Sequence, residues 1–81
     1  MKNPKVYVDV IARFSADGEL FPLEIIWEDG RRYAIDRITE IRRASSMKAG
    51  GTGIRYGCII NNHRTYVFFE EDRWFVERRH E

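Results

Sequence analysis

Residues 23–35, LEIIWEDGRRYAI, place an Asp-Gly pair between two apolar runs, and this pair decides how the surrounding chain folds. An Asp-Gly dipeptide tolerates the positive φ angles of a tight two-residue turn, so Asp29 and Gly30 predict a β-hairpin. The segment before the turn alternates with a period of two, which predicts a strand. Its expected apolar face carries Phe21, Leu23, Ile25 and Trp27.

The chain on either side of this hairpin is less regular. Pro22 has no N–H for a ladder hydrogen bond, so we expect it at a sheet edge or at the start of its strand. After the hairpin, RRYAIDRITEIRRA alternates at Tyr33 and Ile35 and then spaces its isoleucines by three. This pattern favours a long strand with a β-bulge near residues 36–37. A single helical turn over residues 38–46 is the alternative.

The period of two runs through most of the remaining chain. Residues 5–15 alternate and lead to an Asp-Gly turn, and the pattern returns between short polar turns at Asn62-His63 and Glu71-Asp72. So many short strands in one small chain imply a strongly bent sheet, because closure or near-closure removes exposed strand edges. The predicted fold class is therefore all-β, a small SH3-like barrel or bent antiparallel roll of five or six strands.

Length and composition indicate one small domain. The 81 residues leave room for a single hydrophobic core, so we expect one domain over residues 1–81. The single cysteine, Cys58, excludes an intramolecular disulfide and is typical of a reducing compartment. Asp9 and Arg13 interrupt the first apolar run, and no run reaches the roughly 18 residues of a membrane span. These features predict a cytoplasmic, bacterial-type protein with no signal peptide and no membrane association.

The net charge of +1 hides an uneven distribution of charge along the chain. Residues 31–55 carry seven basic and two acidic side chains, a net charge of +5, whereas residues 1–30 carry −3 and residues 56–81 carry −1. A basic block of this kind marks an anion-binding surface or is neutralised by acidic residues on neighbouring strands. The sequence alone leaves both interpretations open.

Four glycines lie in the segment SSMKAGGTGIRYGC, residues 45–58, and raise the question of a phosphate-binding loop. A Walker loop requires a Lys-Ser or Lys-Thr pair after its glycines, whereas Lys48 precedes them. A dinucleotide fingerprint requires its last glycine one place before Gly57, and a helix after it. Two alternatives remain: an ordinary connector between strands, and a nest of backbone N–H groups that binds an anion together with Lys48 and Arg55.

The sequence offers no catalytic or metal-binding constellation. Cys58 falls on an apolar strand face, where a cysteine is usually an inert hydrophobe, and His63 and His80 fall in a predicted turn and in the C-terminal tail. Cys58 and His63 would supply two zinc ligands, whereas a structural zinc site needs four. We therefore expect a protein that is not an enzyme and that binds no metal or other cofactor.

Aromatic side chains fall on both faces of the predicted strands between residues 64 and 76. Tyr66 and Phe68 alternate with Val67 and Phe69, so the two pairs cannot share one interior unless both faces are covered. Exposed rings beside arginines would form a stacking surface for single-stranded nucleic acid. Covered rings would mark a dimer interface or a second packed layer.

Three segments carry a family resemblance: IIWEDGRRYAIDRI, KAGGTGIRYGC and the closing RWFVERR. With them, the chain from about Leu20 to Arg79 resembles a family of short bacterial proteins of unknown function. More distantly, it is similar to a small domain appended to some proteins related to Y-family DNA polymerases. The resemblance implies a compact β module in a nucleic-acid setting and supplies no catalytic residues.

These observations together predict a non-catalytic binding module with one of two functions. The first is weak binding of nucleic acid or another polyanion through the basic glycine-loop region, namely Arg42, Arg43, Lys48, Gly51, Gly53, Arg55 and Tyr56. The alternative is a homodimeric or adaptor domain that binds a protein partner. Its interaction face would be an aromatic sheet face with Tyr66, Phe68 and Trp74.

Overall fold

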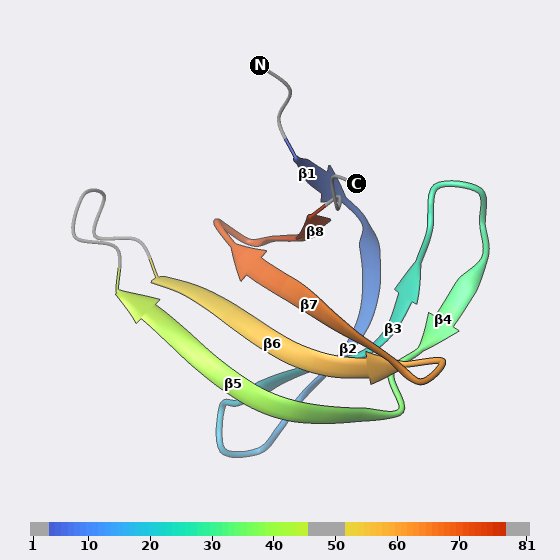
Figure 1. Cartoon of the computed structure of the whole chain (residues 1–81). Helices are drawn as coiled ribbons and strands as arrows, with labels where there is room; N and C mark the ends of the chain where they lie inside the picture. Colours follow the sequence, from blue (N-terminus) through green and yellow to red (C-terminus); the bar gives the residue numbers. More distant parts are fainter. Residues whose placement is uncertain (1–3, 46–51, 78–81) are drawn as a thin grey trace.

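The computed structural model describes residues 4–45 and 52–77, which fold into eight β-strands (Figure 1). The strands are β1 (Lys5–Tyr7), β2 (Asp9–Phe14), β3 (Leu20–Ile26), β4 (Arg32–Ala34), β5 (Arg37–Ser45), β6 (Thr52–Ile60), β7 (His63–Glu70) and β8 (Arg73–Glu77). All pairs are antiparallel, in a five-stranded sheet of order β1-β8-β7-β6-β5 and a three-stranded sheet of order β2-β3-β4. The predicted all-β class is confirmed. The ladders form two sheets and no closed barrel is detected among the described strands, so the SH3-like barrel stays a prediction.

Two continuous segments of the chain contribute a strand to each sheet. Residues 5–14 form β1 and, after Val8, β2; residues 32–45 form β4 and then β5. The Val8 N–H donates to the Trp74 carbonyl at 3.1 Å, and the Asp36 N–H donates to the Ile59 carbonyl at 2.8 Å. Each bend is therefore tied by a backbone hydrogen bond to a strand of the five-stranded sheet.

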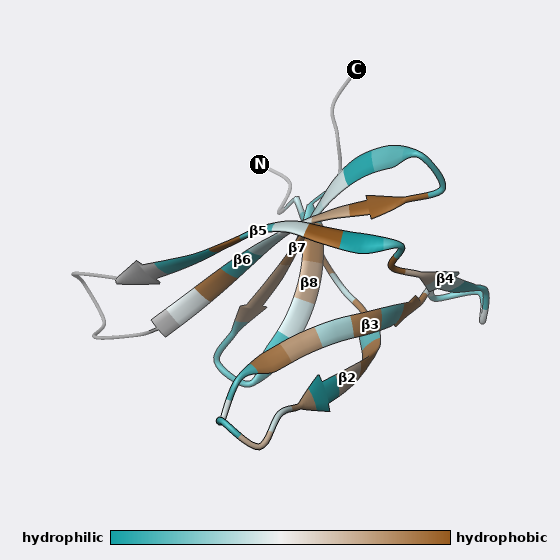
Figure 2. Cartoon of the chain, turned by 90° about the horizontal axis from the view of Figure 1, so that it is seen from below, coloured by the Kyte–Doolittle hydropathy of each residue, from teal (hydrophilic) through white to brown (hydrophobic). Residues whose placement is uncertain are grey.

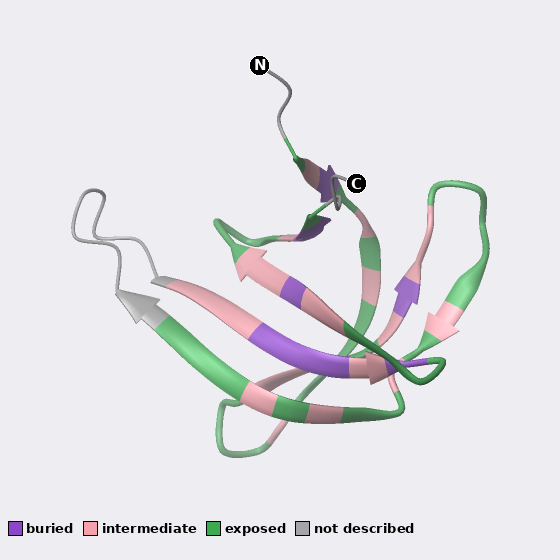
Figure 3. Cartoon of the chain, viewed as in Figure 1, coloured by how far each residue is buried: buried purple, intermediate pink, exposed green. Residues whose placement is uncertain are grey.

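The hydrophobic core lies between the two sheets. Hydrophobic and hydrophilic residues alternate along the strands in Figure 2, so each sheet has one face that can be buried. The purple segments of Figure 3 mark the residues that are buried, which are concentrated on β6. The buried cluster consists of Val6, Ile25, Tyr56, Cys58, Ile60, Val67 and Val76.

The hairpin predicted at Asp29-Gly30 is confirmed, but Trp27 and Arg31 close its loop, so the loop has three residues instead of two and only Gly30 of the pair has a positive φ. Gly30 has a φ of 90°, the Arg31 N–H donates to Asp29 Oδ1 at 2.9 Å, and the Trp27 N–H donates to the Arg31 carbonyl at 2.8 Å. The turn predicted at Glu71-Asp72 is also present, with φ values of 54° and 62°. A pair of positive φ angles is what a two-residue β-turn of type I′ requires.

The turn between β6 and β7 lies one residue earlier than predicted. Asn61 and Asn62 have φ values of 50° and 66°, and His63 already belongs to β7. Asparagine tolerates the left-handed region better than most residues, because its short polar side chain bonds locally. The Asn-Asn pair therefore makes the turn, and His63 is free to extend.

The segment after the Asp-Gly hairpin is not the one long strand that was predicted: it bends at Asp36 from β4 in one sheet to β5 in the other, and β5 carries the β-bulge. The alternative of a helical turn is wrong. The β5–β6 register shifts between Ile38 and Glu40, so Thr39 is the extra residue of the bulge, two places later than predicted. The Thr39 hydroxyl donates to the Gly57 carbonyl at 3.1 Å. The bulge explains the isoleucine spacing of three, because Ile38 and Ile41 pair opposite Cys58 and Tyr56 on the core side.

The prediction that Pro22 lies at a sheet edge or at the start of its strand is wrong, because a second bulge accommodates it. Pro22 lies inside β3, the central strand of its sheet, and opposite Ala12, where the β2–β3 register skips Leu23. The interrupted ladder at a bulge does not require the missing proline N–H. Alternation predicts that Leu23 shares the buried face of Ile25. The bulge instead leaves Leu23 46% exposed.

The described part of the chain contains no helix long and apolar enough to cross a membrane.

Tyr56 links β6 to the hairpin between β2 and β3. Its ring is 1% exposed, its hydroxyl donates to the Leu20 carbonyl, and burial raises its pKa because a phenolate would lose its hydration. We expect Tyr56→Phe to lower the free energy of unfolding by about 1 kcal/mol, since the hydrogen bond is lost inside the protein. Urea denaturation measures this loss. Tyr66→Phe, on the opposite sheet face, is the matched control, and an equal effect would refute the role of the Tyr56 hydroxyl.

Candidate functional site

The five-stranded sheet has a second face, opposite the core, which we call the outer face. One row of directly paired residues crosses all five strands on this face: Tyr7, Phe75, Phe68, Arg55 and Arg42. Their strand neighbours Val6, Val76, Val67 and Tyr56 point into the core, so alternation directs this cross-strand row outward. The row brings together three rings and two arginines from widely separated parts of the sequence.

The three rings of the cross-strand row are in contact with one another. Phe68 and Phe75 stack with centroids 4.9 Å apart and planes 4° apart, and Tyr7 meets Phe75 edge to face at 5.6 Å. Lys5 lies over the Phe75 ring, with Nζ 4.7 Å from the centroid. Phe75 is thereby buried to 4% exposure on the outer face, whereas Tyr7 at the end of the row is 40% exposed.

Cations cover other rings of the outer face as well. The Arg73 guanidinium lies 3.6 Å from the centroid of Tyr7, and the Arg55 guanidinium lies 4.6 Å from the centroid of Tyr66. Such pairs are favourable because the negative face of the ring attracts the cation. The outer face therefore alternates positive charge and aromatic surface.

Glu40 offsets part of the arginine charge. Its Oε2 lies 3.1 Å from Arg55 Nη2 and 3.7 Å from Arg42 Nε, so one carboxylate serves both arginines of the cross-strand row. The Nε of Arg55 is buried and has no hydrogen-bond partner in the structure. Two further exposed arginines, Arg37 and Arg64, pair on either side of Ile59 and extend the positive surface along β5 and β7.

The predicted anion-binding residues are only partly brought together. Arg42 and Arg55 are paired on the outer face, whereas Arg43 pairs with Ile54 and points to the opposite face. Gly53 faces Glu70, whose carboxylate lies where an anion would have to approach: a Cβ on Gly53 would be 3.4 Å from Glu70 Oε2. Lys48 and Gly51 lie outside the described residues.

The prediction that Tyr56 belongs to the polyanion-binding surface is wrong. Its ring is buried in the core, where it packs at 5.7 Å from Trp74, so no base can reach either of its faces. Strand alternation separates the two faces of β6, but the sequence does not show which face is covered.

The predicted interaction face is split by the sheet. Tyr66 and Phe68 lie on the outer face, but Trp74 lies on the core side, with its ring 4.8 Å from Phe69. Trp74 is therefore not part of a surface with the other two rings. The ring that takes its place beside Phe68 is Phe75, its neighbour in sequence.

Several outer-face residues were missed from the sequence. Tyr7, Phe75 and Arg73 come from β1 and β8, which flank the far end of the row, and Arg37 and Arg64 come from β5 and β7. Alternation indicated that Phe75 lies opposite Trp74, but no sequence signal indicates that β1 pairs with β8.

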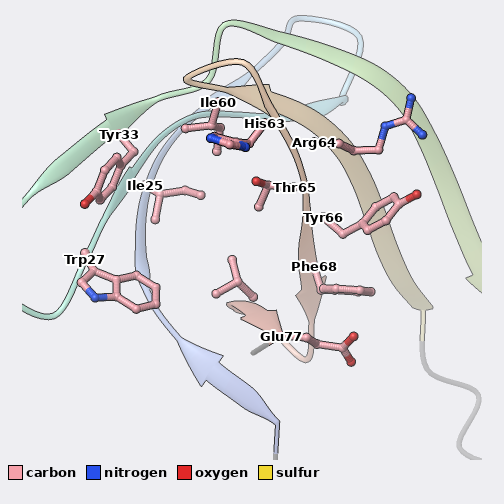
Figure 4. A pocket seen from close by; sticks show the side chains of 11 residues that line it. Ile25, Trp27, Tyr33, Ile60, His63, Arg64, Thr65, Tyr66, Phe68 and Glu77 are labelled. Carbon is pink, nitrogen blue, oxygen red and sulfur yellow. The ribbon is translucent and has the colours of Figure 1, made fainter. Parts of the chain in front are cut away.

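A cavity of about 800 Å³ lies between β3–β4 and the first half of β7 (Figure 4). Its apolar wall includes Ile25, Trp27 and Val76, and its polar rim includes His63 and Glu77. Tyr66 and Phe68 are among its lining residues, and in Figure 4 their rings point to the side of β7 away from Ile25 and Trp27. The volume is within the range of small-ligand pockets.

Cys58 has the properties of a core residue and not of a nucleophile. It is fully buried, and burial raises the pKa of its thiol to about 11, so the thiol stays protonated at neutral pH. In the described segments, no group of three or more His, Cys, Asp or Glu side chains is placed to hold a metal ion.

Fold and surface together define a small all-β protein with an arginine-rich, aromatic sheet face. Comparisons with protein-family models, with curated proteins and with solved structures found no match. Function is therefore inferred from this surface.

Gly57 allows Glu40 and Tyr66 to pack closely beside Arg55. A Cβ at this position would lie 3.0 Å from Glu40 Cγ, 3.0 Å from Thr39 Oγ1 and 3.5 Å from Tyr66 Cε1. We expect Gly57→Ala to lower the free energy of unfolding by about 1–2 kcal/mol, because the bulge and Glu40 must shift. Gly53→Ala is the matched control: only flexible Glu70 atoms lie near its Cβ, so its stability should stay within about 0.5 kcal/mol of wild type. Equal stability of the two variants in urea denaturation would contradict the close packing.

Burial of Cys58 predicts a loss of stability at high pH. The unfolded chain releases the thiol proton near the ordinary pKa of 9.0, whereas the folded chain holds it to about pH 11, so stability falls as pH rises through this window. The expected loss is roughly 2–3 kcal/mol. Denaturation at several pH values, with Cys58→Ala as the control, isolates this contribution because the tyrosines titrate in both proteins. Parallel pH profiles for the two proteins would show that the thiol does not contribute.

Proposed function

We propose that this protein is a non-catalytic binding module for single-stranded nucleic acid or a similar polyanion, and that it binds through the outer face. The observation that carries the proposal is the cross-strand row, in which Tyr7, Phe75 and Phe68 continue directly into Arg55 and Arg42. Rings and cations in one line supply both contacts that a flexible polyanion with flat bases needs.

The two ends of the row suit two parts of a nucleic-acid chain. Tyr7 and the half-buried Phe68 present aromatic surface on which bases can stack, and stacking tolerates any base because every base has a π-face. Arg37 and Arg42 on β5 and Arg64 on β7 are exposed and are placed to contact phosphates. Neighbouring strands are about 4.8 Å apart, so an extended strand can cross the sheet while it contacts both ends.

Arg55 joins the two halves of the proposed surface. It stacks on Tyr66, is paired with Glu40, and keeps one buried Nε donor without a partner. The pair fixes the guanidinium over the sheet, so little side-chain freedom is lost on binding. Glu40 lowers the local positive charge, which favours weak binding over tight binding.

The finer features of the fold are part of the same proposal. We propose that the two sheets form a half-open roll of the SH3-like kind, because the same two chain segments bend from one sheet into the other. The resemblance to a domain appended to proteins related to Y-family polymerases supports a nucleic-acid setting, and a cytoplasmic protein of bacterial type fits that setting.

Binding is tested with dye-labelled single-stranded DNA, single-stranded RNA and duplex DNA by fluorescence anisotropy at low and then physiological salt. The double variant Arg37→Ala/Arg64→Ala should bind more weakly and reduce the salt slope by about 0.7 for each phosphate that is no longer neutralised. Phe68→Leu keeps an apolar side chain but removes the ring, so affinity should fall at least about fivefold with an unchanged slope.

The matched control is Arg31→Ala/Arg32→Ala, which removes the same charge from the β3–β4 hairpin, away from the outer face. It should retain the wild-type affinity and salt slope. Absence of binding to every oligonucleotide at low salt, or equal losses in the two double variants, would refute the proposal. The alternative, an aromatic adaptor surface, would be established by two results together: the wild-type protein binds no oligonucleotide, and Tyr66→Leu and Phe68→Leu each abolish a complex that the wild-type protein forms with itself or with another protein.

A further inference from the structure

One long edge of the three-stranded sheet has no partner strand among the described residues. β2 pairs with β3 on one side, and no described strand pairs with its other side. Just before β2, the backbone on this side is paired with β8: the Val8 N–H donates to the Trp74 carbonyl. Five of the six β2 residues are exposed, including Ile11 at 41% and Phe14 at 73%. Exposed apolar side chains beside open backbone groups mark a site where another strand can pair.

A hydrogen bond at the β2–β3 turn shows which backbone groups of β2 point to this open edge. The Ser15 N–H donates to the Glu19 carbonyl at 2.7 Å, so the Ser15 backbone faces β3. Strand geometry alternates, and β2 itself has no extra residue, so Arg13, Ile11 and Asp9 also face β3. The N–H and C=O groups of Val10 and Ala12 therefore face outward.

The sequence along this edge is complementary to itself. Residues 9–13 read Asp-Val-Ile-Ala-Arg, with Ile11 at the centre. When two such strands run antiparallel about a two-fold axis at Ile11, each Asp9 lies opposite Arg13 of the second copy. Ile11 then meets its own counterpart, and Val10 lies opposite Ala12.

We propose that two copies of this chain associate by antiparallel pairing of their β2 strands, centred on Ile11. The Val10 and Ala12 backbone groups form the hydrogen-bonded pairs between the copies. The Ile11 pair and the two Asp9–Arg13 pairs fall at the non-hydrogen-bonded positions, where opposite side chains approach most closely. Both the backbone phase and the charges fit this register, since a shift by one residue would place each outward-facing backbone group opposite one that faces β3.

The surrounding structure limits the pairing to residues 9–13. β8 occupies the edge from Val8 onward, so a second copy cannot extend further in that direction. At that limit, Phe14 of the second copy reaches the level of Val8, beside a cavity of about 470 Å³ lined by Val8, Val10 and Trp74, among others. The interface is isologous and closes after two copies, which removes an edge that would otherwise template open-ended aggregation.

Charge reversal tests the register directly. The wild-type protein should sediment as a concentration-dependent monomer–dimer mixture, and Arg13→Glu or Asp9→Arg alone should raise the dissociation constant about tenfold or more, because like charges then face each other twice. The double variant Asp9→Arg/Arg13→Glu should restore dimerisation. An equimolar mixture of the two single variants should form heterodimers, because each charge on one variant then faces its opposite on the other.

Amide hydrogen exchange locates the interface on the backbone. Exchange of the Val10 and Ala12 amides should slow as protein concentration rises, whereas that of Ile11, already directed to β3, should not. Arg31→Glu, an exposed charge reversal on the β3–β4 turn, is the matched control and should dimerise like wild type. Thermal unfolding of each variant shows that the monomer is folded, which matters for Arg13→Glu because Arg13 packs at 5.6 Å from the Phe21 ring.

A wild-type protein that stays monomeric at every concentration would overturn the proposal. So would a dimer that persists in both single variants, or one that Phe68→Leu abolishes while Arg13→Glu does not. None of these outcomes bears on oligonucleotide binding, because the β2 edge and the outer face belong to different sheets.

Discussion

Two bends, each tied to the five-stranded sheet by a backbone hydrogen bond, join the two sheets. At Val8 the first segment passes from the five-stranded sheet into the three-stranded one, and at Asp36 the second segment passes back, with bonds to the Trp74 and Ile59 carbonyls. A chain of 81 residues buries too little surface to support two independent layers. Sharing the segments 5–14 and 32–45 between the sheets lets one cluster of apolar residues serve both.

The bends also determine which residues remain at the surface. Since the three-stranded sheet covers one face of the five-stranded sheet, every second residue of β1, β8, β7, β6 and β5 is directed to the other face. If its rings were fully exposed, that face would be an apolar patch that promotes aggregation. Instead, Lys5 lies over Phe75, Arg73 over Tyr7 and Arg55 over Tyr66, so the rings are partly shielded by cations. The proposed binding of stacked, negatively charged ligands would use the same arrangement of rings and cations.

The two proposed surfaces are compatible with each other. Pairing at β2 would use an edge of the three-stranded sheet and leave the outer face of each copy free. Two outer faces on one dimer would raise the effective concentration for a second contact along the same polyanion. Weak binding by one copy, as the Glu40 pairing of Arg55 and Arg42 favours, would then be strengthened without any new contact within a copy.

Much of the local structure could be predicted from the sequence, because strand alternation and turn chemistry are properties of neighbouring residues. The Asp29-Gly30 hairpin, the Glu71-Asp72 turn and the bulged strand after residue 36 all depend on such short-range preferences. The places where prediction failed are those where a distant strand decides. Pro22 is tolerated in a central strand because a bulge lies opposite Ala12, and Leu23 is exposed for the same reason.

The candidate site shows the same division. The sequence by itself determined that rings and charges alternate along the strands, and that basic residues gather between positions 31 and 55. Only the tertiary structure decided which face is covered, because burial depends on where the second sheet packs. It placed Tyr56 and Trp74 in the core and Arg43 on the opposite face from Arg42. It also aligned Tyr7, Phe75 and Phe68 with Arg55, since the pairing of β1 with β8 and of β8 with β7 joins residues that no local pattern relates.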